Sequence, residues 1–156
     1  MLPLADPSAS GLGAKMAEPR RHAFSLADEL AALPTAIDWL RAVLASHAVP
    51  SDTAFRLELC VHEALENVLR HGHEAGAPRE IELTVEVFPG HAVARICDDG
   101  GPFDPLSAPL PPKPATLDSA MIGGLGLRLL REFASECHYI RDGGKNVLTI
   151  VARRAA

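Results

Sequence analysis

Three polar side chains in the middle of the chain recur at helical spacing. Glu63, Asn67 and His71 stand four residues apart in a stretch whose apolar residues also follow a helical period. Residues four apart lie on the same face of a helix, so the three form a polar column beside an apolar stripe. A carboxylate can accept a proton from a hydroxyl group, and an amide oxygen can bind Mg²⁺. The column indicates either a catalytic helix or an ordinary solvated helix edge, because polar residues commonly flank an apolar face.

Two glycine-containing segments follow this predicted helix. The first is DDGGPF at residues 98–103, where an apolar strand stops. Its carboxylates can accept hydrogen bonds from an amine, and its glycines let a flat ring approach the backbone. The second is GGLGL at residues 123–127, directly before a predicted helix, where free N–H groups and the helix dipole favour a phosphate chain. Each segment alone is typical of an ordinary turn, but their occurrence together favours a nucleotide site.

The three segments together resemble the nucleotide-binding boxes of the histidine-kinase-like ATPase superfamily. EALEN at 63–67, DDGGPFDP at 98–105 and GGLGL match these boxes in order. The nearest likeness is to the anti-sigma-factor serine/threonine kinases, because HEALENVLRHG contains E-x-x-x-N and the second box has the form D-x-G-x-P-F-D-P. The likeness covers about residues 22–153. It implies the α+β fold of this superfamily, a two-layer α/β sandwich of the Bergerat type with a mainly antiparallel sheet and helices on one face.

The resemblance also implies roles for individual residues. Asn67 would be the ligand of Mg²⁺, Glu63 the general base, and Asp98 the acceptor for the adenine amino group. Gly100 would support the adenine ring. The other residues that the resemblance places at the nucleotide are His71, Pro102, Phe103, Gly123, Gly124, Leu125, Gly126, Leu127 and Arg128. The implied cofactors are ATP and Mg²⁺.

The chain departs from the family pattern before the second glycine box. Family members often have an arginine there, whereas Met121 and Ile122 precede Gly123. A basic contact to the phosphates would therefore need Arg128 or Lys145. Residues 104–122 are rich in proline and belong to a connection far longer than the usual length of about four to six residues, so they are interpreted as a lid over ATP or as an inert insertion.

Apolar patterns predict the elements that position these residues. Residues 1–20 have a composition typical of a flexible tail, and residues 21–156 are expected to form one ATP-binding kinase domain. Strands are predicted at 22–26, 80–88, 91–97, 137–141 and 146–152, the last two around a turn at 142–144. Helices are predicted from about 33 to the residue before Pro50, at 51–71 and at 127–134.

Composition and charge disfavour several other classes of protein. The formal net charge of −5, without a long Lys/Arg cluster, argues against a nucleic-acid partner. No apolar run approaches the roughly 20 residues of a membrane span, and the N-terminal residues lack the order of a secretory signal. We therefore expect no membrane association and a cytoplasmic location. Cys60, Cys97 and Cys137 lack metal-ligand spacing and are predicted to be small buried apolar groups.

These inferences predict an ATP-dependent protein serine/threonine kinase of a bacterial partner-switching system. By resemblance, its substrate would be an anti-sigma-factor antagonist with a STAS domain, with sequestration of a sigma factor or another regulator as a second activity. A homodimer is compatible with the sequence. The alternative is a nucleotide-responsive binding module that sequesters a regulator without kinase activity. A histidine-kinase fragment is disfavoured because the residues before the first helix cannot present a phospho-accepting histidine, and a gyrase-type hydrolase because a transducer domain is not recognisable.

Overall fold

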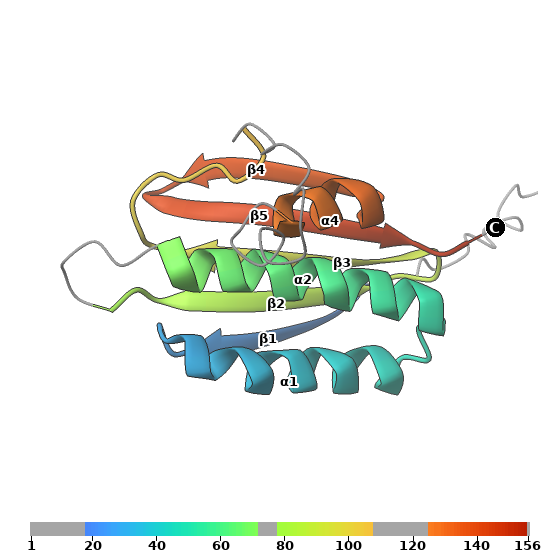
Figure 1. Cartoon of the computed structure of the whole chain (residues 1–156). Coiled ribbons are helices and arrows are strands. Elements are labelled where there is room, and N and C mark those ends of the chain that lie inside the picture. Colours follow the sequence, from blue (N-terminus) through green and yellow to red (C-terminus); the bar gives the residue numbers. More distant parts are fainter. Residues whose placement is uncertain (1–17, 72–77, 108–124, 156) are drawn as a thin grey trace, which may run out of the picture.

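The computed structural model describes residues 18–71, 78–107 and 125–155. Its helices and strands follow the order of the predicted elements (Figure 1). The first half contains β1 (Arg20–Leu26), a short 3-10 turn η1 (Leu30–Ala32), α1 (Leu33–Ser46) and α2 (Ser51–His71). The second half contains β2 (Ile81–Val87), β3 (His91–Asp98), α4 (Leu125–Phe133), β4 (Glu136–Asp142) and β5 (Lys145–Arg153).

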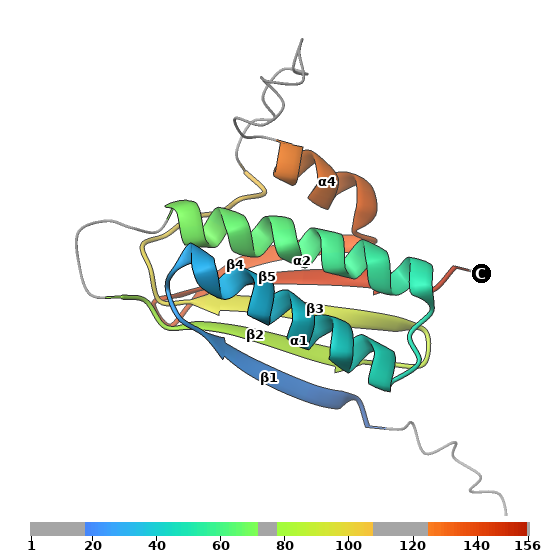
Figure 2. The same ribbon diagram turned by 60° about the horizontal axis from the view of Figure 1, so that its bottom comes forward.

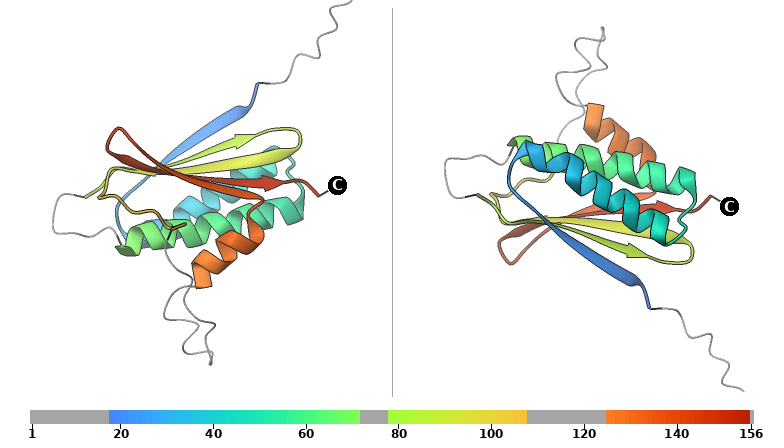
Figure 3. Two further views of the ribbon diagram at one scale, coloured as in Figure 1. Left: turned by 90° about the horizontal axis from the view of Figure 1, so that it is seen from above. Right: turned by 90° about the horizontal axis from the view of Figure 1, so that it is seen from below.

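The strands of the described residues form one five-stranded sheet in the order β1-β2-β3-β5-β4. Every neighbouring pair is antiparallel. The helices α1, α2 and α4 all lie on the same face of this sheet, as the turned views show (Figures 2 and 3). The predicted fold, a two-layer α+β sandwich with a mainly antiparallel sheet, is confirmed.

Helix α2 lies over the middle of the sheet because its apolar residues recur at helical spacing. Its buried stripe packs against the inward-facing residues of the central strands, where side chains alternate between the two faces. The residues of this stripe are Leu57, Val61, Ala64, Leu65 and Leu69. The opposite flank of the helix keeps Glu63 and Asn67 half-buried rather than sealed in the core.

The register of β3 and β5 brings together two polar residues that are distant in the sequence. Asp98, the last residue of β3, pairs with Asn146, the second residue of β5. Both are buried, with 4% and 6% of their surface exposed, whereas most of the buried residues are apolar. Buried polar groups are stable only when they are hydrogen-bonded, so this end of the sheet must contain a polar network.

The cysteines behave largely as the sequence predicts. Cys60 is fully buried against α4, with its Sγ 4.0 Å from the carbonyl oxygen of Leu129, and Cys137 is half-buried on β4. Burial raises the pKa of Cys60 to about 12 and that of Cys137 to about 11. Both thiols therefore remain neutral at pH 7, as expected of small apolar groups in a core.

Several predicted boundaries differ from the structure. Strand β1 begins at Arg20, so the last residue assigned to the tail belongs to the sheet. Helix α4 begins at Leu125, two residues before the predicted start, because the leucines around Gly126 continue its apolar spacing. The predicted tail up to residue 17, the predicted lid from residue 108 onward, and Gly123 and Gly124 lie outside the described residues. None of the helices in the described part of the chain is long and apolar enough to cross a bilayer.

Candidate functional site

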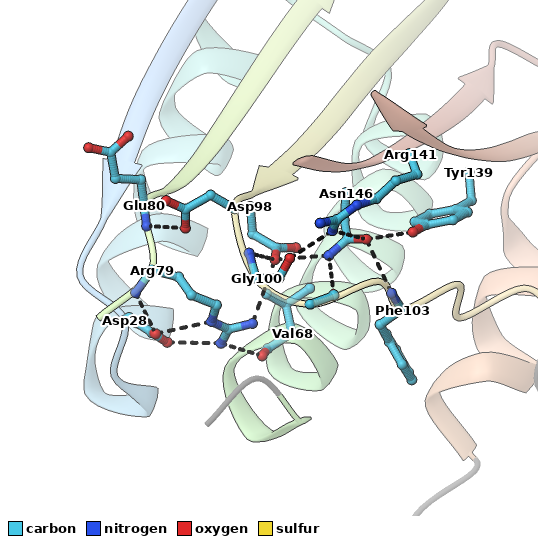
Figure 4. A network of polar contacts seen from close by, with 12 residues as sticks. Asp28, Val68, Arg79, Glu80, Asp98, Gly100, Phe103, Tyr139, Arg141 and Asn146 are labelled. Carbon is cyan, nitrogen blue, oxygen red and sulfur yellow. Dashed lines mark hydrogen bonds and ion pairs between the residues drawn. The ribbon is translucent and has the colours of Figure 1, made fainter. Parts of the chain in front are cut away.

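The buried carboxylate of Asp98 is the centre of a polar network at the end of β3 (Figure 4). Its Oδ1 accepts hydrogen bonds from the backbone N–H of Gly100 at 3.0 Å and from Nδ2 of Asn146 at 3.1 Å. The same oxygen lies 3.7 Å from Nη1 of Arg79. Among the described residues, no hydrogen bond or ion pair involves Oδ2 of this carboxylate. One oxygen is thus held by the protein, and the other remains available as an acceptor.

Oδ2 of Asp98 is not sealed inside the protein. In the described part of the chain, Thr53 Oγ1 is the only fully buried side-chain oxygen or nitrogen that lacks a hydrogen-bond partner. Oδ2 of Asp98, which has no partner among these residues, is therefore not fully buried and keeps some contact with the surface. This geometry suits recognition of an N–H group on a ligand.

Arg79, in the segment before β2, lies beside the Asp98 carboxylate and also contacts α2. Its guanidinium forms a paired interaction with Asp28 and donates to the backbone carbonyl of Val68 at 2.7 Å. Val68 directly follows Asn67 on α2, so Arg79 connects the helix of the E-x-x-x-N motif to the Asp98 segment (Figure 4). The network therefore links α2, one residue after the E-x-x-x-N motif, to the Asp98 segment.

Gly100 lies where a larger residue would not fit. A Cβ atom at this position would stand 2.7 Å from Cδ of Arg79 and 2.8 Å from Oδ1 of Asp98, closer than real Cβ contacts. At the neighbouring Gly101, nothing lies within 4 Å of the corresponding Cβ position. Glycine at residue 100 therefore lets Arg79 and the Asp98 carboxylate pack directly against the backbone.

Phe103 and Pro102 continue this segment at the surface. The backbone N–H of Phe103 donates to Oδ1 of Asn146 at 3.2 Å, while its side chain is 40% exposed. Pro102 is also exposed. The segment is therefore anchored through its backbone, and its apolar side chains remain accessible to a ligand or a partner.

Glu63 lies in an acidic stretch of α2. Its carboxylate is 23% exposed and stands 3.7 Å from Nδ1 of His62. Burial raises the pKa of Glu63, the like charge of Glu66 raises it further, and His62 opposes the shift. A carboxyl group with a raised pKa is a better proton acceptor near neutral pH than an ordinary one.

The side chains of His62, Glu63 and Glu66 lie together on this flank. Their nearest ligand atoms are all within 4.8 Å of one another. Glu66 is also paired with Arg70 at 2.8 Å, which offsets part of its charge. Asn67 directly follows Glu66 on the helix and is half-buried.

The third predicted box is described only in part. Leu125, Gly126 and Leu127 form the first turn of α4, whose unpaired N–H groups can receive an anion. Arg128 follows them and is half-buried. The side chain of His71, at the last residue of α2, lies outside what the structure describes, as do Gly123 and Gly124.

Lys145 faces away from this site. Successive strand residues point to opposite faces, and Asn146 points to the helix side, where it reaches Asp98. Lys145 acts electrostatically on Cys97, whose position between Ile96 and Asp98 also places it on the other face. Of the two basic residues considered for the phosphates, this geometry favours Arg128.

Comparison with known proteins agrees with this geometry. Residues 26–152 match the model of the histidine kinase-like ATPase domain. The chain belongs to the histidine kinase-like ATPase family. Within this family it is 36% identical, over 120 residues, to the serine/threonine-protein kinase BtrW of Bordetella bronchiseptica, an alignment that covers 77% of this chain and 84% of BtrW. The predicted membership of the serine/threonine-kinase branch is confirmed.

Several solved structures share this fold. The RsbU and RsbW domains of Rv1364c from Mycobacterium tuberculosis superpose with a TM-score of 0.62 at 18% identity, covering 86% of this chain and 32% of that one. The SiaB-SiaC complex from Pseudomonas aeruginosa gives a TM-score of 0.50 at 18% identity, covering 84% of this chain and 88% of that one. The histidine kinase domain of a blue-light activated kinase from Erythrobacter litoralis gives 0.51 at 24% identity, covering 79% and 59%.

The sequence did not predict the residues that support Asp98. Arg79, Tyr139, Arg141 and Asn146 come from three other segments, and only the strand register brings them to the end of β3. One signal was available for Asn146. An amide in an otherwise apolar strand is unfavourable unless it has a specific partner. No local pattern identifies the partner, because it lies 48 residues earlier.

Proposed function

We propose that this protein is an ATP-dependent protein serine/threonine kinase, and that its substrate is an anti-sigma-factor antagonist with a STAS domain. The observation that carries the proposal is the buried Asp98 carboxylate, whose Oδ1 is held by the protein while Oδ2 has no partner among the described residues. Its support from comparison is the 36% identity to a serine/threonine-protein kinase. Sequestration of a sigma factor or another regulator is the second activity that we propose for the same domain.

The residues of the site fit a magnesium-bound adenine nucleotide. Oδ2 of Asp98 can accept the N–H of the 6-amino group, and residue 100 has no side chain that would displace a ring. The first turn of α4 offers backbone N–H groups to the phosphates, and Asn67 offers an amide oxygen of the kind that Mg²⁺ prefers. Bound Mg-ATP supplies the phosphoryl group and the positive charge that stabilises its transfer.

The proposed chemistry of the chain itself centres on Glu63. Its carboxylate would accept the proton of the substrate's serine or threonine hydroxyl as that oxygen bonds to the γ-phosphorus of ATP, while the bond from this phosphorus to the bridging oxygen breaks and ADP leaves. Partial burial next to Glu66 raises the pKa of Glu63 and so strengthens it as a base. Asn67, one helical turn later, would hold the metal.

The proposal is tested with the purified protein, Mg-ATP labelled at the γ-phosphate and the STAS-domain proteins of its own genome. We expect label on a serine or threonine of at least one of them. Glu63→Gln should bind ATP almost normally but transfer phosphate about 10² to 10⁴ times more slowly. Asn67→Ala should lose the Mg²⁺ dependence of binding and also fail in transfer. Glu58→Gln is the matched control and should transfer normally, because Glu58 lies on the same helix but pairs with Arg41 of α1.

The same variants separate the kinase from a nucleotide-responsive binding module. A kinase with Glu63→Gln should accumulate a complex with ATP and the unphosphorylated partner, which size-exclusion chromatography detects. For a module without turnover, Glu63→Gln should behave as the wild type in every assay. Transfer at the wild-type rate by Glu63→Gln would remove this residue from the proposed mechanism.

A further inference from the structure

The side chain of Asn146 uses its entire hydrogen-bonding capacity within the site. Its Nδ2 donates to Oδ1 of Asp98 at 3.1 Å and to the carbonyl oxygen of Gly101 at 2.8 Å. Its Oδ1 accepts from the backbone N–H of Phe103, from the hydroxyl of Tyr139 and from Nη1 of Arg141. An amide has two N–H donors and one acceptor oxygen, so no capacity remains for a ligand.

These partners determine the orientation of the amide. On one side it meets a carboxylate and a carbonyl, which can only accept, and on the other an N–H and a guanidinium, which can only donate. Rotation by 180° would place its oxygen against Asp98 and its NH₂ against Arg141. The amide is therefore locked with an N–H directed at Oδ1 of Asp98.

The fixed orientation of the Asn146 amide determines which oxygen of Asp98 remains available to a ligand. Oδ1 is occupied by Asn146, by the N–H of Gly100 and by the nearby guanidinium of Arg79. The carboxylate cannot rotate without breaking the bonds from Asn146 and Gly100. Oδ2 therefore keeps a fixed direction, which is the condition for selective recognition of an N–H donor on a ligand.

We infer that Asn146 is a positioning residue that gives the nucleotide site its preference for purines with a 6-amino group. The inference rests on the proposed function, in which Asp98 accepts the amino group of adenine. Asn146 itself does not touch the base. It acts by holding Asp98, and Tyr139 and Arg141 act one step further away by holding Asn146 (Figure 4).

The test compares two nucleotides, ATP and purine riboside triphosphate, which lacks the 6-amino group. Wild-type protein should bind ATP about tenfold or more tightly than the analogue, because only ATP can donate a hydrogen bond from its 6-amino group to the charged carboxylate of Asp98. Asn146→Ala should lower this ratio roughly fivefold or more. Most of the change should be in the affinity for ATP, since the analogue does not use Oδ2 of Asp98. Thr149→Val, on the opposite face of the same strand, is the control and should keep the ratio.

A purely structural role predicts a different result. If Asn146 only stabilises the fold, Asn146→Ala weakens the binding of both nucleotides by the same factor, and the unchanged ratio overturns the inference. Tyr139→Phe keeps the ring and removes only the hydroxyl that bonds Asn146, so it decides the question if Asn146→Ala does not fold. Its ratio should fall in the same direction by a smaller factor, and an unchanged ratio would again overturn the inference.

The wild-type ratio distinguishes this inference from the proposed function. A wild type that binds both nucleotides equally removes Asp98 from adenine recognition and overturns the inference, whereas transfer of labelled phosphate to a partner tests the proposed function separately. A wild type that prefers ATP, with Asp98→Asn losing the preference and Asn146→Ala keeping it, supports the nucleotide site and rejects the positioning role alone.

Discussion

Arg79 and Asp28 form a two-pronged ion pair although they are 51 residues apart in the sequence. Nε of Arg79 lies 3.0 Å from Oδ2 of Asp28, and Nη2 lies 2.9 Å from Oδ1. The side chains are only 9% and 3% exposed. The pair fastens the connection after β1 to the segment before β2, and the same guanidinium also binds the carbonyl of Val68 and lies beside Asp98.

Loss of Arg79 should destabilise the protein strongly. Arg79→Ala removes the guanidinium that pairs with the buried carboxylate of Asp28, and breaking a buried ion pair from one side costs about 3 to 5 kcal/mol. Urea denaturation should show this loss as a lower midpoint with an unchanged slope. The control is Arg70→Ala, which removes an exposed pair with Glu66 and should cost about 0.5 kcal/mol. Equal losses for the two variants would contradict the special role of Arg79.

Asp98→Asn should weaken ATP binding at least about tenfold. The N–H of Gly100 and Nδ2 of Asn146 both donate toward position Oδ1, so the amide oxygen of the variant must face them. Its NH₂ group then replaces Oδ2 and meets the adenine amino group, donor against donor. Isothermal titration calorimetry with ATP measures the effect, and an unchanged dissociation constant would show that Asp98 does not contact the base.

Substitution of the two adjacent glycines should have different effects. Gly100→Ala should lower ATP affinity about tenfold or destabilise the domain by about 1 to 3 kcal/mol, because its Cβ would collide with Arg79 and with Asp98. Gly101→Ala is the matched control, since nothing lies within 4 Å of its Cβ position. Nucleotide titration and thermal unfolding of both variants measure the difference. Similar behaviour of the two would show that the close approach at Gly100 has no consequence.

The pH dependence of phosphate transfer should follow the neighbours of Glu63. The base must be deprotonated, and its pKa is raised by burial and by Glu66, so the rate should rise with pH above the range of an ordinary carboxyl group. Glu66→Gln removes a cause of the raised pKa and should move this rise to lower pH. His62→Gln removes the imidazole that lowers the pKa and should move it to higher pH. Steady-state rates between pH 4 and pH 8, roughly bracketing the carboxyl range, measure both shifts; shifts in the same direction would contradict the assignment.

The sequence predicted the fold because each element carries its own periodic pattern. The apolar stripe of α2 and the alternation in β2 and β3 are local signals, and each agrees with the observed element. The ends of elements were less accurate, as at Leu125, because the glycines before and within the first turn of α4 are typical of a turn and favour a later helix start.

The candidate site was predictable only where it lies on short motifs. Asp98 and Gly100 were found because a carboxylate and glycines at the end of a strand form a recognisable string. Arg79 and Asn146 were not found, since their contacts depend on the pairing of β3 with both β2 and β5. Strand register depends on the pairing of distant segments, so it cannot be predicted from any short stretch of the sequence.

The turn at Gly143 and Gly144 makes the length of one hairpin critical. Both glycines have positive φ angles, 57° and 78°, as a two-residue hairpin turn requires, and this turn sets the pairing of Arg141 with Asn146. Insertion of a single residue there would turn β4 over, so that His138 and Ile140 would replace Tyr139 and Arg141 on the face of Asn146. The hairpin at Pro89 and Gly90 lies at the other end of the sheet, far from this network. The turn at Gly143 therefore determines which residues of β4 contact Asn146, and an insertion of one residue there would loosen the hold on Asp98.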